Sequence, residues 1–210
     1  MEIYAISDLH LSFGVDKPMN VFGNVRENYE EKIKQNWEET VKENDIVIIP
    51  GDISWGIDLN EALPDFKFIE ALPGKKIILR GNHDYYFSTK TKLEKFLYSN
   101  NLKTISILHN NAISIEKYIL CGARGWGKTE SNDKKLDKKI LEREKNRLKI
   151  SLEEGKKIQN EVFLEKGIKK EIIVAMHFPP FISNYTEILK EYNVKKCIYG
   201  HLHRLWTLHD

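Results

Sequence analysis

The sequence predicts an α/β fold with two β-sheets, and three observations support this prediction. Five apolar runs of strand length end at glycine, proline or a polar side chain, which is typical of buried strands. Amphipathic helical patterns separate the first three runs, as expected for parallel strands joined by crossover helices. Later in the chain, three short strand-like runs follow one another closely, which indicates antiparallel hairpins and a second sheet.

The first half of the chain alternates strands with helices. The predicted strands are 3–6, 46–49 and 76–80. The predicted helices are 26–43, 59–72 and 88–100. In the first helix, Ile33, Trp37 and Val41 recur at helical spacing among charged residues. In the second, Pro64 is expected to restart the helix and Pro73-Gly74 to end it.

The second half is predicted to begin with the strands 104–108, 112–116 and 118–122. Asn110-Asn111 and Glu116-Lys117 join them and suit tight turns. Residues 128–170 carry Lys and Glu at helical spacing, so we interpret them as a charged helical insert, either one helix with a solvated face or a pair of helices. The alternative is a surface that recognises an anionic substrate or partner. The last predicted strands are 172–176 and 197–199. No linker or internal repeat divides the sequence, so we expect a single domain over residues 1–210.

The composition is that of an ordinary globular protein and excludes several classes. Of 210 residues, 41% are hydrophobic and 30% charged, and the net charge is only +2, which demands no polyanionic partner. No run reaches the roughly 18 apolar residues of a membrane helix, and no signal-peptide pattern follows Met1. Cys121 and Cys197 both lie in strand-like runs and suit buried reduced thiols. We therefore expect a cytoplasmic protein that does not associate with membranes.

Side chains able to bind metals follow the apolar runs. They are Asp8, His10, Asp52, Asn82, His177, His201 and His203. Open α/β sheets bind ligands at the carboxyl ends of their strands, where these residues would lie. Seven ligands exceed the four of a tetrahedral zinc site, and their mixed oxygen and nitrogen donors suit two metal ions. Asp8 with His10, and His201 with His203, are one residue apart, so extended backbone would point each pair to one side.

Each of these residues alone has a simpler explanation. A single aspartate or asparagine after a strand commonly forms a turn, and a single histidine is usually a hydrogen-bonded polar group. The grouping argues against these explanations, because five of the seven histidines fall in the strand-end motifs.

The motifs together resemble those of the calcineurin-like metallophosphoesterase superfamily. In order and spacing, the matching residues are Asp8-x-His10, Gly51-Asp52, Gly81-Asn-His-Asp84, His177 and Gly200-His-x-His203. The loop 122–126 is further similar to that of a small bacterial branch of predicted phosphohydrolases. The resemblance implies a four-layer αββα sandwich, in which two mixed sheets are flanked by helices.

The resemblance also implies a role for each matching residue. Asp8, His10, Asp52 and His203 would hold a first metal. Asp52 would bridge to a second metal, completed by Asn82, His177 and His201. His83 would face the substrate and protonate the leaving oxygen, with Asp84 orienting its imidazole. The cofactors would be two divalent ions among manganese, iron, zinc, nickel and cobalt.

The function that follows is a dinuclear-metal-dependent phosphoesterase for phosphomonoester or phosphodiester bonds. The hypothesis includes in-line attack on phosphorus by a hydroxide held between the metals, with Arg80 or Arg124 clamping a phosphate oxygen. For Arg80, an ordinary surface position at a strand end explains the sequence equally well. The expected substrate is small or medium in size. The alternatives are a nuclease, which the near-neutral charge does not favour, and a non-catalytic scaffold, which would not need His83.

The end of the sequence departs from the superfamily pattern. Members usually continue after the Gly-His-x-His motif with strands that complete the second sheet, whereas this sequence stops seven residues after His203. Either the chain is truncated, the insert 128–170 compensates, or a sheet edge is left bare. A bare apolar edge invites pairing with another chain, so a tendency to form homodimers is expected.

Overall fold

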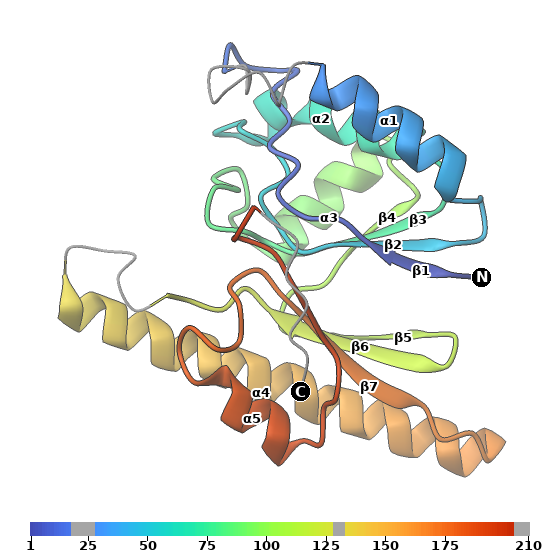
Figure 1. Ribbon diagram of the computed structural model, residues 1–210, viewed down its shortest axis with the longest axis vertical. Helices are drawn as coiled ribbons and strands as arrows, with labels where there is room; N and C mark the ends of the chain where they lie inside the picture. The colour runs from blue at the N-terminus through green and yellow to red at the C-terminus, as the bar shows by residue number, and fades with distance from the viewer. Residues whose placement is uncertain (18–27, 128–132, 204–210) are drawn as a thin grey trace. The chain divides into compact units, whose positions relative to one another are not determined.

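The computed structural model describes residues 1–17, 28–127 and 133–203. The chain divides into two compact units, Met1–Ile107 and Leu108–Asp210, and each contains its own four-stranded sheet (Figure 1). Five helices accompany the two sheets in the described residues, which confirms the predicted α/β class. The expectation of a single domain over residues 1–210 stays a prediction.

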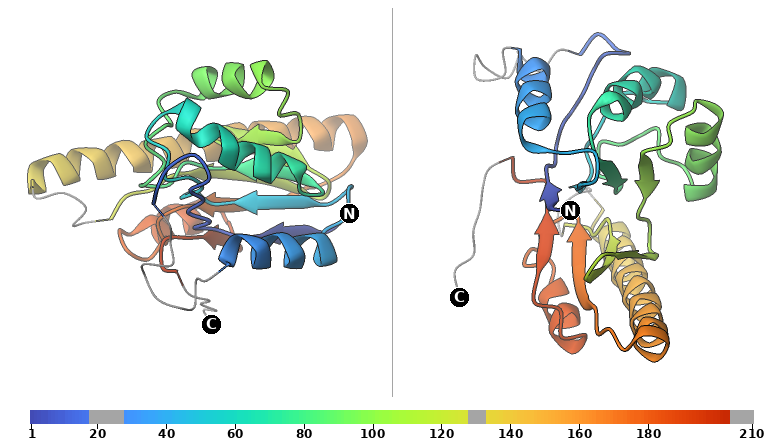
Figure 2. Two further views of the ribbon diagram at one scale, coloured as in Figure 1. Left: turned by 90° about the horizontal axis from the view of Figure 1, so that it is seen from above. Right: turned by 90° about the vertical axis from the view of Figure 1, so that its right-hand side faces the viewer.

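The first unit is built on a wholly parallel sheet. Its strands, in both chain and sheet order, are β1 (Ile3–Ala5), β2 (Ile46–Ile49), β3 (Lys75–Ile78) and β4 (Ile105–Ile107). The crossover helices are α1 (Tyr29–Thr40), α2 (Leu59–Ala71) and α3 (Lys90–Ser99). All three cover the same face of the sheet (Figures 1 and 2). Parallel strands require such crossovers, because after each strand the chain must return to the end of the sheet where the next strand begins.

Each helix packs on the sheet through a stripe of apolar side chains. Trp37 of α1 and Phe66 and Ile69 of α2 join one core with Val47 and Ile49 of β2. α2 is continuous through Pro64, contrary to the expected restart at that proline. The hydrogen bond that proline cannot make is offset by the burial of flanking helical residues.

The strand predicted over 104–108 does not form a hairpin with its successor. β4 instead pairs in parallel with β3, with Ile105 opposite Lys76 and Ile107 opposite Ile78. The reason is burial, because Ile105 and Ile107 belong to the core of the first unit. The second sheet therefore begins one strand later than expected, and only the second sheet is mixed.

The second unit has one antiparallel and two parallel strand pairs. Its strands, in both chain and sheet order, are β5 (Ala112–Ile115), β6 (Tyr118–Ala123), β7 (Glu171–Met176) and β8 (Cys197–Tyr199). The β5–β6 hairpin is confirmed, and β6–β7 and β7–β8 are parallel. The helices α4 (Lys134–Lys166) and α5 (Tyr185–Glu191) lie on one face of this sheet (Figures 1 and 2).

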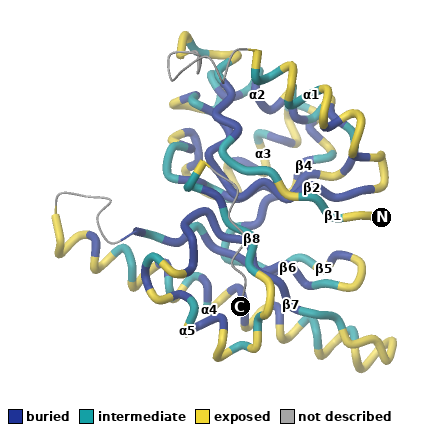
Figure 3. Tube along the Cα trace, in the orientation of Figure 1, coloured by how far each residue is buried: buried dark blue, intermediate teal, exposed yellow. Residues whose placement is uncertain are grey.

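The charged insert forms a single helix of 33 residues, α4, while its residues 128–132 lie outside the described part of the chain. One side of α4 is buried against the sheet and the other is exposed (Figure 3). Leu148, Ser151, Leu152 and Gly155 lie on the buried side at helical spacing. Within the described residues, no helix has the length and apolar character needed to cross a lipid bilayer.

Gly155 is the point of close approach between α4 and β6. A Cβ atom at this position would lie 2.3 Å from Sγ of Cys121, which is buried on β6. One turn earlier, the hydroxyl of Ser151 accepts a hydrogen bond from the Gly122 amide (2.8 Å) and donates to the Asn111 carbonyl (2.7 Å). Contact and hydrogen bonds together fix the helix on the sheet.

The variant Gly155→Ala is expected to lower the free energy of unfolding by about 1–3 kcal/mol, because the added methyl group overlaps Cys121. In the background Cys121→Ala the same substitution is expected to cost less, because the overlapping sulfur is gone. Urea denaturation of the four proteins checks this. If Gly155→Ala instead stabilised the protein, the close contact with Cys121 would not restrict this position. The gain expected from helix propensity alone is about 1 kcal/mol.

Candidate metal centre

Three loops at the carboxyl edge of the first sheet carry the predicted residues of the first unit. They follow β1, β2 and β3, which end at the same edge because they are parallel. The first two loops are joined by backbone hydrogen bonds from the Asp8 amide to the Gly51 carbonyl (3.1 Å) and from the His10 amide to the Asp52 carbonyl (2.9 Å). The His83 amide donates to Oδ1 of Asp52 (2.8 Å), which attaches the third loop.

Asp8, His10 and Asp52 come together in space. Each offers a ligand atom, and these atoms lie within 4.8 Å of one another. Nε2 of His10 and Oδ2 of Asp52 are 3.8 Å apart, and both side chains are almost completely buried. Two carboxylates and one imidazole are suitable donors for a divalent metal of intermediate character. Asn82, the predicted ligand on the third loop, is half-buried and directly precedes His83.

The backbone is left-handed at five of the seven predicted ligands. The φ angles are 58° at Asp8, 47° at His10 and 53° at Asp52, and in the second unit 72° at His201 and 51° at His203. Residues with side chains rarely adopt this conformation, which costs about 1–3 kcal/mol and concentrates at functional sites. It also differs from the extended backbone expected for the Asp8–His10 and His201–His203 pairs. These side chains are aimed by left-handed turns rather than by strand alternation.

Gly81 is required by the close approach of Asp52. A Cβ atom at position 81 would lie 2.1 Å from Oδ1 of Asp52 and 2.3 Å from its amide nitrogen. No residue with a side chain can occupy this position without moving Asp52. The motif glycine therefore keeps the second and third loops in contact.

The electrostatics of this edge favour a bound cation. Burial, followed by the nearby carboxylates of Asp84 and Asp8, raises the pKa of Asp52 to about 8. Burial likewise raises the pKa of Asp84. A divalent ion beside Asp52 would supply the positive charge that stabilises the ionised carboxylate. The donor types and the charge thus both fit a metal ion.

Asp84 accepts hydrogen bonds from backbone amides of two loops. Its Oδ2 accepts hydrogen bonds from the amides of Gly81 (2.6 Å) and Asp52 (2.9 Å), and its Oδ1 from those of Ile53 (2.8 Å) and Ser54 (3.4 Å). These four backbone donors surround a carboxylate that is fully buried. Asp84 is therefore a buried hub that joins the loops after β2 and β3. Its role in orienting the imidazole of His83 stays a prediction.

The imidazole of His83 lies among aromatic rings. Its ring centre is 4.8 Å from that of Trp55, 5.7 Å from that of His10 and 6.1 Å from that of Tyr85. The hydroxyl of Tyr85 is 3.5 Å from Nδ1 of His83. Trp55 also stacks on His10, with ring centres 4.7 Å apart and an angle of 22° between the planes. Trp55 and Tyr85 are site residues that the motifs did not indicate, although both lie within three residues of a predicted one.

In the second unit, predicted ligands lie just after β7 and β8. His177 follows β7 and is fully buried, and its amide donates to the Arg124 carbonyl (3.1 Å). The Gly200 amide, after β8, donates to the His177 carbonyl (3.1 Å). The ring centres of His177 and His201 are 5.2 Å apart. His203 is exposed two residues later. The adjacent parallel strands thus bring His177 and His201 together within this unit.

The two arginines proposed to clamp phosphate lie in different surroundings. Arg80 is half-buried directly before Gly81, with its guanidinium 5.7 Å from the ring centre of Phe87. Arg124 is mostly buried in the second unit, where it lies 3.6 Å from the carboxylate of Glu144 and 4.8 Å from the ring centre of Trp126. Glu144 is fully buried and also binds Arg147 (2.6 Å). The ion pair gives Arg124 a structural role within its own unit.

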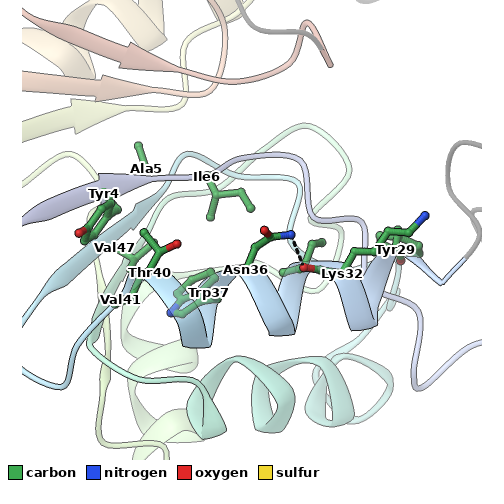
Figure 4. Close-up of a pocket in the computed structure, with 11 residues that line it drawn as sticks. Tyr4, Ala5, Ile6, Tyr29, Lys32, Asn36, Trp37, Thr40, Val41 and Val47 are labelled. Carbon is green, nitrogen blue, oxygen red and sulfur yellow. Dashed lines mark hydrogen bonds between the residues drawn. The ribbon is translucent and has the colours of Figure 1, made fainter.

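A hollow of about 360 Å³ also lies between β1 and α1 (Figure 4). Its walls are mainly apolar. Ile6 lies just after β1, Val47 lies in β2, Trp37 lies in α1 and Val41 directly follows α1. None of the predicted ligands lines it. This hollow therefore does not belong to the candidate metal centre.

Comparisons with known proteins agree with the motifs. The sequence model of the family described as calcineurin-like phosphoesterase matches residues 1–205. No curated protein matches the sequence. Among solved structures, the crystal structure of a protein of unknown function from Aquifex aeolicus aligns with 94% of this chain and 88% of that one, at 20% identity and a TM-score of 0.43. That likeness is too low to bear on function.

Proposed function

The chain belongs to the calcineurin-like phosphoesterase family, and from this premise we propose that it is a metal-dependent hydrolase of small or medium phosphomonoesters or phosphodiesters. Family membership supports the hydrolysis of phosphoric esters in general. The observation that carries the proposal is the grouping of Asp8, His10 and Asp52 on left-handed backbone at the ends of neighbouring parallel strands. Strained backbone is retained where a specific arrangement of side chains is needed.

The proposed cofactor is a pair of divalent ions. Asp8, His10, Asp52 and His203 would hold the first, and Asp52 would be shared with the second. Asn82, His177 and His201 would complete the second site. When bound, such ions lower the pKa of coordinated water and neutralise charge on phosphoryl oxygens. The donor set suits manganese, iron, zinc, nickel or cobalt, whose availability would decide among them.

His83 is proposed to be the general acid that protonates the leaving oxygen. We assign the transferred proton to Nε2, because Nδ1 faces the hydroxyl of Tyr85 at 3.5 Å. Tyr85 would thereby hold the imidazole in the orientation that proton transfer needs. Trp55, which lies against both His83 and His10, would exclude water from one side of the reacting group.

The phosphate clamp is assigned to Arg80. It belongs to the same loop as Asn82 and His83, and a guanidinium at that position would offer two parallel donors to phosphate oxygens. Arg124, the other candidate, would first have to leave its ion pair with Glu144.

The proposal is tested by stripping the protein of metal, refilling it with each divalent ion and assaying chromogenic monoesters and diesters. We expect turnover with at least one ion, and none in the stripped protein. A matched control is Tyr98→Ala, which alters an exposed residue of α3 and should leave turnover unchanged. Protein that binds two ions yet hydrolyses no ester with any of them would contradict the enzyme proposal and favour the scaffold. Single-stranded DNA as a further substrate separates a small-ester hydrolase from a nuclease, which should degrade it.

A further inference from the structure

A hollow of about 440 Å³ lies beside the candidate metal ligands of the first unit. Its walls come from residues 15–17 in the loop after His10, from Trp55 and Ile57 in the loop after Asp52, and from Glu61 and Tyr85. All these segments belong to the first unit. The hollow was not indicated by any sequence motif.

Two aromatic side chains that line the hollow, Trp55 and Tyr85, also contact candidate site residues. Trp55 lines the hollow and at the same time stacks on His10, a predicted ligand. Tyr85 lines it and places its hydroxyl 3.5 Å from Nδ1 of His83, the proposed acid. A group bound here would lie against Trp55, whose ring centre is 4.8 Å from that of His83.

The walls of the hollow are largely apolar, and they are exposed. Ile57 is 70% exposed and Tyr85 56% exposed. Single exposed apolar residues are ordinary, but two that line one hollow together with the half-buried Val15 and Trp55, beside polar catalytic groups, mark a binding site. The ring of Tyr85 can stack on a flat ring or meet it edge to face, and Ile57 adds apolar surface beside it. The ring of Trp55 already contacts His10 and Lys17.

The charges at the hollow do not favour an anionic occupant. The ammonium group of Lys17 is 3.5 Å from the ring centre of Trp55, a cation–π contact. Asp16 and Glu61 also line the hollow, so acidic residues outnumber basic ones there. A chain of further phosphates leading away from the reacting group would meet these carboxylates. An uncharged group is the better fit.

The hollow is held in shape by hydrogen bonds. Oε2 of Glu61 accepts from the Ile57 amide (2.8 Å). Asp65 of α2 accepts from the Phe13 amide (2.8 Å) and from the hydroxyl of Ser54, which tie the two lining loops to the helix. A preformed site binds its ligand without the cost of ordering loops.

We propose that this hollow binds the leaving group of the substrate and selects an uncharged group with a flat apolar ring. The inference rests on the proposed function, since it names the substrate class of that same site. It makes Ile57, Trp55 and Tyr85 determinants of specificity and places a single phosphoryl group, rather than a polyphosphate or nucleic-acid strand, at the metal ligands.

Two pairs of substrates test this proposal in the metal-loaded protein. The first pair is 2-phenylethyl phosphate and ethyl phosphate, and the second is their methyl diesters. Both members of a pair release a primary alcohol, so a difference in kcat/KM reports binding of the ring. We expect the phenyl compound of whichever ester class is hydrolysed to be preferred on the order of tenfold or more. Equal kcat/KM values within both pairs would overturn the inference and leave the proposed function standing.

The variant Ile57→Ser locates the preference in this hollow. It is expected to reduce the ratio of the two kcat/KM values by about threefold or more, because a polar side chain replaces an apolar wall. The matched control is Ile150→Ser, at a position on α4 that is 59% exposed, and it should leave the ratio unchanged. If Ile57→Ser and Ile150→Ser change the ratio equally, the ring binds at a different site.

Calorimetric binding of 2-phenylethylphosphonate and ethylphosphonate gives a readout that does not depend on turnover. We expect tighter binding of the phenyl compound, again weakened by Ile57→Ser. If no ester is hydrolysed but this binding preference is found, the hollow is a ring-binding site and the proposed catalytic function fails. If neither hydrolysis nor binding distinguishes the ring, the inference is wrong.

Discussion

Replacement of His83 by alanine is expected to lower kcat by about 10²- to 10⁴-fold while the protein keeps its full metal content. The reason is that His83 has a proton-transfer role in this account, whereas the neighbouring Asn82 has a metal-binding one. The His83 side chain lies among Trp55, His10 and Tyr85, at the border of the proposed leaving-group site. Steady-state kinetics and metal analysis of the same preparation check both parts.

The matched control for His83→Ala is Asn82→Ala, one position earlier in the same loop. Asn82→Ala should weaken metal binding, and part of its lost activity should return at high metal concentration. The activity of His83→Ala should not respond to added metal. If His83→Ala instead lost a metal ion, the assignment of these two roles would be reversed.

Replacement of Asp84 by alanine is expected to lower the free energy of unfolding by about 3–5 kcal/mol. The carboxylate accepts hydrogen bonds from four buried backbone amides, which alanine would leave without their acceptor. Asp84→Asn should cost less than alanine, because it keeps one acceptor oxygen. Denaturation of metal-free protein measures the effect without a contribution from lost metal binding.

Asp58 provides the control for this comparison. Its carboxylate also accepts hydrogen bonds from backbone amides, those of Asn60 (2.7 Å) and Glu61 (3.1 Å), but at the exposed start of α2. Asp58→Ala should cost only about 0.5–2 kcal/mol, as for other helix caps. A loss at Asp84 no larger than at Asp58 would show that the buried hub is not a main source of stability for these loops.

Much of the fold could be predicted because apolar runs mark buried strands clearly. β2 is buried at every position and was predicted with its observed bounds. The strand over 104–108 was assigned to the wrong sheet, because its short distance to the next strand suggested a hairpin. Local spacing does not show that Ile105 and Ile107 join the core of the first unit. α5 was missed because it has only seven residues and no side-chain cap at Asn184.

The candidate site was predicted in its residues but not in its geometry. Composition and order identify Asp8, His10 and Asp52, whereas their left-handed backbone depends on contacts between loops far apart in the sequence. The partners of Asp84 could not be predicted for the same reason, since three of its four donors lie about thirty residues earlier. Trp55 and Tyr85 carry no metal-binding or acid–base signal, so only their position beside His83 indicates a role.

Central to the proposed function is a pair of catalytic metal ions, with Asp52 as a ligand of both. The most direct measurement is the number of manganese ions bound per chain, determined by elemental analysis after equilibrium dialysis of metal-stripped protein. We expect two ions in the unaltered protein, one in Asn82→Ala and none in Asp52→Ala. Fewer than two ions in the unaltered protein, or two retained by Asp52→Ala, would contradict this expectation.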